Sequence, residues 1–91
     1  MVTDGKTYEV TGDLTPDVTG TYENGGEYEG KRYYQRTVDP WYIWWNGISH
    51  WFISEVLGLT GVARWSRMDP DIEGEYEPLG DALGDATVTE I

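Results

Sequence analysis

The stretch WYIWWNGISHWFIS, residues 41–54, holds four of the five tryptophans of the chain. The pair Asn46-Gly47 lies in its middle, and such pairs adopt the positive φ values that tight hairpin turns require. Aromatic and β-branched residues, which are typical of strands, flank the pair on both sides. The stretch therefore predicts a β-hairpin, and its aromatic content makes this hairpin the expected centre of the fold.

The length of the turn decides which residues share a face. A two-residue turn pairs Trp45 with Ile48, and a four-residue turn pairs Trp45 with His50. Both turns give the same two faces, whereas a three-residue loop would exchange the faces of one strand. The first expected face consists of Trp41, Ile43, Trp45, Ile48, His50 and Phe52, and the second of Tyr42, Trp44, Ser49, Trp51 and Ile53.

Both faces are rich in apolar groups, although an antiparallel sheet usually has one wet face. In one interpretation both faces are covered, one by the core and the other by the loops at 55–61 and 69–85. In the other interpretation one face is exposed and grips a partner protein or stacks on sugar rings, because Trp and Tyr are enriched at binding hot spots. The binding residues expected in that case are Tyr42, Trp44, Trp51 and Trp65.

Working outward, twelve Gly and four Pro divide the chain into pieces too short for stable helices, and the periodicity is mostly two. Loops are expected at 13–20 and 55–61. Strands are expected at 6–12, 30–38, 62–68 and 86–91, a hairpin about Asn24-Gly25 at 21–29, and one short strand within 69–85. The chain is thus predicted to form a single all-β domain over 1–91. We expect a small antiparallel meander or partly open barrel of about six to eight short strands, with little or no helix.

The two ends of the chain are expected to lie at the edges of the sheet. Residues 1–19 would contribute an edge strand or an arm, and 1–10 and 86–91 are candidate edge strands. Exposed edges invite strand addition from another chain. Backbone pairing at such an edge would supply affinity, and the aromatic face would supply specificity.

One tetrapeptide pattern recurs along the chain. Tyr8, Tyr22, Tyr28 and Tyr76 lie in KTYE, GTYE, GEYE and GEYE. Their irregular spacing excludes a solenoid repeat. We interpret the pattern as a strand idiom in which the tyrosine faces inward and its acidic neighbours face water.

Composition limits the classes of partner. Seventeen acidic residues against six basic ones give a net charge of −11. Nucleic acids and anionic membrane surfaces are therefore not expected partners, since both attract basic surfaces. A basic partner or bound cations are favoured instead. There is no cysteine, no visible signal peptide and no apolar run of about 20 residues, and the initial Met leads us to expect a complete gene product.

Catalytic and metal-binding patterns are sparse. His50 is the only histidine, lies in an aromatic strand and is expected to be packed rather than catalytic. A glycosidase carboxylate pair needs a cleft that a domain of this size rarely builds, so we expect no enzymatic activity. Asp69, Asp71 and Glu73, at alternate positions, are weak calcium candidates; Asp13 and Asp17 are weaker ones. No other cofactor is expected.

A resemblance covers about residues 18–89. Its parts are the Gly-x-Tyr strand, the YIWW-[ND]G…W-x-I-S hairpin, the W-x-R strand and the closing G-x-A-T-V. Together they resemble a short aromatic β module of uncharacterised phage structural proteins and of repeats in large bacterial and environmental proteins. The departure is Ile48-Ser49-His50, where the pattern more usually has small polar residues.

The resemblance implies a non-enzymatic virion or surface module. We expect an accessory component that decorates a capsid or joins a tail or fibre, and whose partners are other subunits of the assembly or further copies of the chain. The alternative function is a carbohydrate-binding module in which Tyr42, Trp44 and Trp51 form a stacking platform. The expected location is the virion, or alternatively the extracellular space or a cell surface.

Overall fold

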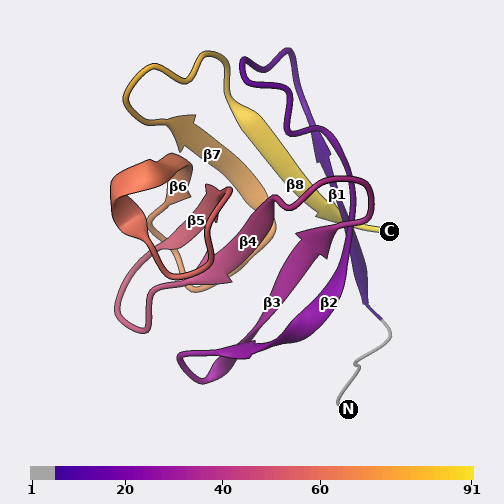
Figure 1. Cartoon of the computed structure of the whole chain (residues 1–91), viewed down its shortest axis with the longest axis vertical. Helices are drawn as coiled ribbons and strands as arrows, with labels where there is room; N and C mark the ends of the chain where they lie inside the picture. Colours follow the sequence, from indigo (N-terminus) through magenta and orange to yellow (C-terminus); the bar gives the residue numbers. More distant parts are fainter. Residues whose placement is uncertain (1–5) are drawn as a thin grey trace.

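The computed structural model describes residues 6–91. In it, each strand pairs with the next one along the chain, and the last strand pairs with the first (Figure 1). The strands are β1 (Thr7–Thr11), β2 (Gly20–Tyr28), β3 (Lys31–Arg36), β4 (Tyr42–Trp45), β5 (Trp51–Ser54), β6 (Ala63–Arg67), β7 (Gly74–Pro78) and β8 (Ala86–Glu90). One turn of 3-10 helix, η1 (Thr60–Val62), precedes β6. The predicted all-β class is confirmed, and the sheet is a closed antiparallel barrel.

Closure removes the predicted edges. Tyr8 in β1 lies opposite Tyr22 in β2 on one side and opposite Glu90 in β8 on the other. The expectation of edge strands at 1–10 and 86–91 is therefore wrong for the residues that the structure describes; residues 1–5 lie outside them. Pairing of both terminal strands satisfies their backbone groups, which is how barrels avoid open edges.

The central hairpin forms, but its loop differs from the expected one. Ile43 lies opposite Ile53 and Trp45 opposite Trp51, so the loop comprises residues 46–50. The side-chain oxygen of Asn46 accepts hydrogen bonds from three backbone N–H groups inside this loop, at 2.9, 2.9 and 3.1 Å. A loop with an odd number of residues exchanges the faces of one strand, so the predicted faces are wrong: Trp51 and Ile53 point inward beside Ile43 and Trp45.

Aromatic rings fill much of the barrel interior. Tyr22, Trp65 and Tyr76 have no exposed surface, and the rings of Tyr8 and Tyr34 meet edge to face at 4.6 Å between centroids. The interior cluster consists of Tyr8, Val10, Leu14, Val18, Tyr22, Tyr34, Trp41, Ile43, Trp45, Trp51, Ile53, Trp65, Ile72, Tyr76, Ala82, Ala86 and Val88. Because each ring buries roughly 150–250 Å², few aliphatic side chains suffice for this core.

The predicted turn at Asn24-Gly25 is a bulge within one strand. β2 runs through it for nine residues, and the register with β3 shifts between Asn24 and Gly26. The ring of Tyr33 lies so close to Gly25 that a Cβ atom there would collide with it. The turn itself comes later, at Glu29 and Gly30, which have φ values of 52° and 81°.

Two segments of similar sequence lead into β2 and β7: PDVTGTYE at 16–23 and PDIEGEYE at 70–77. In the first, the buried hydroxyl of Tyr22 donates to the carbonyl of Val18 at 2.7 Å. In the second, Tyr76 donates to the carbonyl of Ile72, also at 2.7 Å. Tyrosine corners of this kind tie a strand to the turn that precedes it.

An arginine braces each of these turns. Arg36 in β3 donates to the carbonyl of Asp17 at 2.9 Å, and Arg67 in β6 donates to the carbonyl of Asp71 at 2.9 Å. The register through β2, β1, β8 and β7 places Gly20, Val10, Val88 and Gly74 side by side. The two turns thus occupy equivalent places on either side of the β1–β8 pair, one before β2 and braced from β3, the other before β7 and braced from β6.

Candidate functional site

Three of the four predicted binding residues are buried. Trp51 and Trp65 lie in the barrel interior, with 4% and 0% of their surface exposed, and Trp44 is 1% exposed. Tyr42 is half-buried on the outer side of the barrel, where its ring contacts Tyr33. These residues therefore do not form an exposed aromatic platform.

Trp44 lies outside the barrel under a cover of its own. Its indole N–H donates to Ser54 Oγ at 2.8 Å, and this hydroxyl donates to the carbonyl of Val56 at 2.6 Å. The rings of Tyr28 and Phe52 pack against Trp44, and Gly58 lies against the hydroxyl of Tyr28. Of the two loops expected to cover the second face of the hairpin, 55–61 lies on the Trp44 side, whereas in loop 69–85 the carbonyl of Pro70 accepts a hydrogen bond from the inward-facing Trp51.

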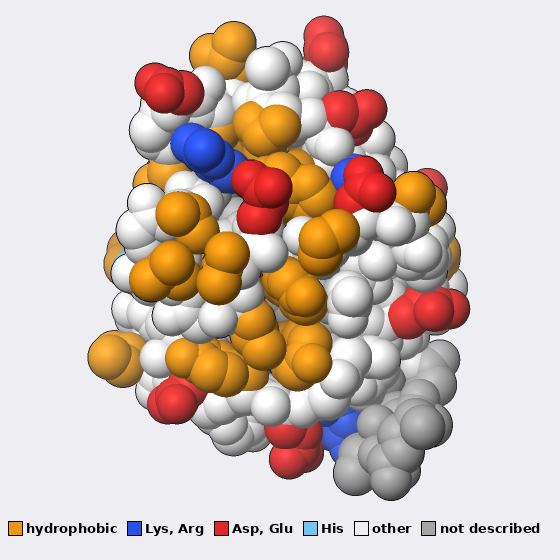
Figure 2. All heavy atoms as spheres, viewed as in Figure 1, with side chains coloured by type: hydrophobic (Ala, Val, Ile, Leu, Met, Phe, Trp, Pro, Cys, Tyr) orange, Lys and Arg blue, Asp and Glu red, His pale blue; other side chains and the backbone are white. Residues whose placement is uncertain are grey.

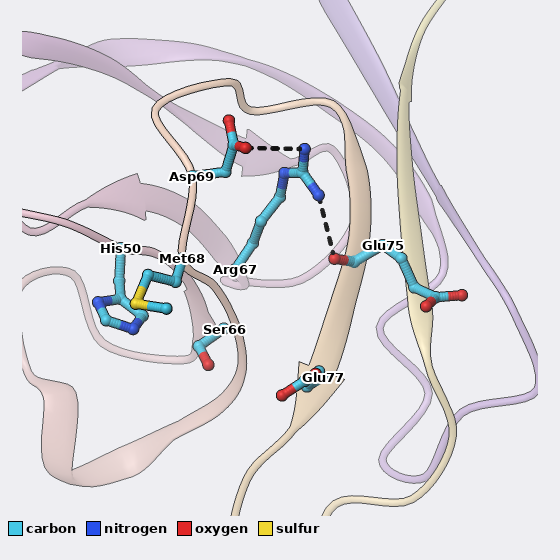
Figure 3. A pocket seen from close by; sticks show the side chains of 7 residues that line it. All are labelled: His50, Ser66, Arg67, Met68, Asp69, Glu75 and Glu77. Carbon is cyan, nitrogen blue, oxygen red and sulfur yellow. Dashed lines mark hydrogen bonds and ion pairs between the residues drawn. The ribbon is translucent and has the colours of Figure 1, made fainter.

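A groove opens on the outer surface between β6 and β7. Two residue pairs form the ladder between these strands, Trp65 with Pro78 and Ser66 with Glu77, and the strands diverge on the Arg67 side of it. The groove has a volume of about 370 Å³ (Figure 3). Its lining residues are His50, Ser66, Arg67, Met68, Asp69, Glu75 and Glu77.

Arg67 bridges the gap where the ladder ends. Its guanidinium donates to the carbonyls of Asp71 at 2.9 Å and Glu75 at 3.5 Å, and it forms an ion pair with Asp69 at 3.8 Å. Figure 3 shows the side chain extended between Asp69 and Glu75. Gly74 allows this position, because a Cβ atom there would collide with the guanidinium. Arg67 is therefore a structural brace that is also paired with Asp69.

Glu75 and Glu77 are the acidic residues on the β7 side of the groove; in Figure 3 the carboxylate of Glu77 lies on the same side as Ser66, and that of Glu75 points away from it. Both side chains are exposed on β7. Within residues 6–91, neither carboxylate takes part in an ion pair. They give this part of the surface uncompensated negative charge.

The opposite wall is largely apolar, and its side chains can adapt their conformation. The imidazole of His50 stacks on Phe52 at 5.7 Å, and its Nδ1 lies 2.6 Å from Ser49 Oγ. Met68 is 75% exposed and lies beside the imidazole in Figure 3. Ile48, 83% exposed in the neighbouring hairpin loop, adds another exposed apolar side chain. A thioether and a stacked imidazole can adapt to the stem of an incoming side chain.

A second pocket, of about 430 Å³, occupies the mouth of the barrel. Lys6, Lys31 and Arg32, half of the six basic residues, line it together with Asp71, Glu73 and Glu90. The rings of Tyr8, Tyr34 and Trp51 contribute to its lining. Barrel mouths are common places for small-molecule sites.

The weak calcium candidates do not converge. Asp69 and Asp71 each accept a hydrogen bond from the backbone N–H two residues later, at 2.8 and 3.1 Å, and Glu73 accepts one from the backbone N–H of Glu90 at 3.0 Å. Asp17 likewise accepts a hydrogen bond from the backbone N–H of Thr19 at 3.0 Å. In the described part of the chain, three or more metal-binding side chains do not come together at any place, and Asp13 therefore belongs to no such group. Asp17, Asp69 and Asp71 therefore hold turns, and Glu73 holds the end of β8.

Sequence reasoning did not single out Met68, Glu75 and Glu77. Glu75 and Glu77 belong to the recurring GEYE pattern, which was interpreted only as a strand idiom. The signal that points to them is the pairing of their strand with β6, which is a tertiary property. His50 was expected to be packed, and its ring is indeed stacked, but it also lines the groove.

No protein-family model, curated protein or solved structure matches the chain. The structure contains, within its described residues, no helix with the length and hydrophobicity needed to span a bilayer. The function is therefore argued from the geometry of the two pockets and from the surface.

Proposed function

We propose that this chain is a non-enzymatic interaction protein, a small accessory subunit that attaches to a larger protein assembly. The sequence resemblance supports a virion as that assembly, with the chain decorating a capsid or joining a tail or fibre. Its partners are then other subunits of the particle.

The groove between β6 and β7 is the observation that carries this proposal. It combines exposed carboxylates on one side with an exposed methionine and a stacked histidine on the other. Because the barrel is closed, strand addition at a free edge is not the means of attachment among residues 6–91. Attachment through side chains in a groove replaces it.

The remaining surface is compatible with protein contacts. Figure 2 shows hydrophobic side chains gathered over the middle of one face, with acidic groups around them. Large hydrophobic residues are exposed at Val38, Ile48, Val56, Leu59, Met68, Leu83 and Ile91. Contiguous exposed apolar surface on a small domain marks interaction sites, and the net charge of −11 keeps such a domain soluble.

The test is the protein composition of particles purified from the source that encodes the chain. Quantitative mass spectrometry should find the chain at a fixed ratio to the major structural protein. Recombinant M68D should fail to rebind particles stripped of the chain, whereas V38D, which also places a charge at an exposed apolar position, should rebind. Absence of the chain from every particle fraction would refute the proposal.

Carbohydrate binding is the second candidate function, and the barrel mouth favours it over a flat platform. Carboxylates and cations there can hydrogen-bond to sugar hydroxyls above a floor of three largely buried aromatic rings, one of which is Trp51. A glycan array with wild type, K31A and E73Q should show a ligand whose binding both changes weaken. Binding to no glycan, or binding that both variants retain, would exclude the barrel mouth as a carbohydrate-binding site.

A further inference from the structure

We propose that the groove between β6 and β7 receives one lysine or arginine side chain from the partner protein. This inference rests on the proposed function and specifies the chemistry of the contact. The cationic head would lie at Glu77, with Glu75 adding negative charge from the same strand, and the aliphatic stem would lie against Met68 and His50.

Charge selects a cation. Glu75 and Glu77 are exposed and form no ion pair with another described residue, while Asp69 is already paired with Arg67. An anionic side chain would meet like charge on the β7 side, and Arg67, the only Lys or Arg among the described lining residues, is held by two carbonyls and Asp69. A lysine or arginine head gains an ion pair and leaves no described pair broken.

Shape selects a side chain with a long apolar stem. In Figure 3, Ser66 lies between the His50–Met68 wall and Glu77, so Glu77 and the apolar wall face the same space, whereas the carboxylate of Glu75 points away from His50 and Met68. The stems of Lys and Arg cover apolar surface while their heads reach polar groups. A bare metal ion would use only the acidic side of the groove, and the described carboxylates form no metal-binding group.

The position on the barrel also favours a side chain from a folded surface. The groove lies outside the barrel beside the short β6–β7 ladder, and Ile48 and Met68 project near its rim with 83% and 75% of their surface exposed. A partner could therefore insert one basic residue and cover these two side chains around it. Such an arrangement, a central anchor with apolar surroundings that exclude water, is common at protein interfaces.

The experiment is an NMR titration of the ¹⁵N-labelled full chain with short peptides. The probe has one lysine flanked by leucine and alanine, a second peptide has arginine in its place, and the control has acetyl-lysine. The basic peptides should shift the amide signals of His50, Ser66, Met68 and Glu77, and acetyl-lysine should not. Binding should weaken as salt rises from about 0.05 to about 0.5 M, because exposed charge pairs are screened.

Paired variants localise the charge effect. E75Q together with E77Q should weaken peptide binding about two- to fivefold, as expected for losing one exposed ion pair and a neighbouring negative charge. E9Q together with E27Q removes the same charge from exposed positions on β1 and β2 and should leave binding nearly unchanged. An equal loss in both double variants, or equal binding of the acetyl-lysine peptide, would overturn the inference.

The two proposals fail separately. If E75Q/E77Q still rebinds particles as well as wild type does while M68D does not, the chain is an accessory subunit but its groove does not hold a cation. If the peptides bind as expected and the chain is absent from particles, the groove is a cation-binding site and the accessory role is wrong.

Discussion

Trp44 donates its indole N–H to Ser54 Oγ at 2.8 Å, across the hairpin and outside the barrel. The serine is fully buried, and its hydroxyl in turn donates to the carbonyl of Val56 at 2.6 Å. One hydroxyl therefore holds both Trp44, which packs outside the barrel interior, and the start of the loop that covers it. The covered face of the hairpin depends on this serine.

Replacing Ser54 should destabilise the protein more than replacing another serine. In S54A the buried indole N–H loses its acceptor, which costs about 1–3 kcal/mol. Urea unfolding followed by tryptophan fluorescence would measure the change. S66A, at a half-buried position on the outer surface, should change the unfolding free energy by less than about 0.5 kcal/mol. Equal effects of the two changes would contradict the role given to Ser54.

The two tyrosine corners should contribute similar stability. Y22F and Y76F each remove a buried hydrogen bond to a carbonyl four residues earlier. Each should lower the free energy of unfolding by about 1 kcal/mol, and the effects should add because the two sites belong to different turns. Denaturant unfolding of both single variants and the double variant provides the measurement.

The same tyrosines should make the fold sensitive to alkali. Burial raises the pKa of Tyr22, and burial raises the pKa of Tyr76 well above the ordinary value of 10.0. The unfolded chain therefore loses these protons first, so stability is fully present below about pH 10 and falls as the pH rises further. Thermal unfolding between pH 9 and 11.5 should show a smaller decline for Y22F/Y76F than for wild type. An identical decline would contradict the prediction.

Gly74 should be one of the least replaceable glycines. Its φ of 136° is unfavourable for other residues, and a Cβ atom would collide with the guanidinium of Arg67. G74A should cost more than about 1 kcal/mol and disturb the groove, since Arg67 must move. G61A provides the control, because open space surrounds that position. Thermal unfolding distinguishes the two; a neutral G74A would mean that Arg67 moves freely.

Asp17 should contribute to stability until the pH becomes strongly acidic. Hydrogen bonds from the hydroxyl and then the backbone N–H of Thr19 lower the pKa of this exposed carboxyl below 3.8. A lowered folded-state pKa gives stability that is present above 3.8 and lost as the pH falls through the lower value. D17N should flatten the acid limb of the stability curve below pH 4 relative to wild type. Circular dichroism during an acid titration of D17N and wild type tests this.

The sequence predicted the class of fold because its local signals agree. Gly and Pro divide the chain into short segments, aromatic residues alternate, and Asn46-Gly47 lies between two apolar runs. These signals together predict short antiparallel strands. Closure was not predictable from these signals. The pairing of β1 with β8 depends on the accumulated twist and register of all the strands, and no single segment encodes it.

Two errors come from side-chain chemistry that turn rules do not cover. Asn46 accepts three backbone hydrogen bonds and so holds five residues in the loop, which exchanged the hairpin faces and placed Trp51 inside. Tyr33 packs on Gly25, which turned an apparent hairpin signal at Asn24-Gly25 into a bulge. The groove could not be predicted, because it arises where two strands diverge and not from a run of residues.

The pairing of β1 with β8 also brings the two ends of the described chain together: the backbone N–H of Ile91 donates to the carbonyl of Thr7 at 2.8 Å. A short linker would be enough to join these ends, and new termini could then be opened at the exposed loop 46–50. A circularly permuted barrel should therefore fold. For the same geometric reason, the whole barrel could be carried as an inserted domain within a surface loop of another protein, with entry and exit points only one strand spacing apart.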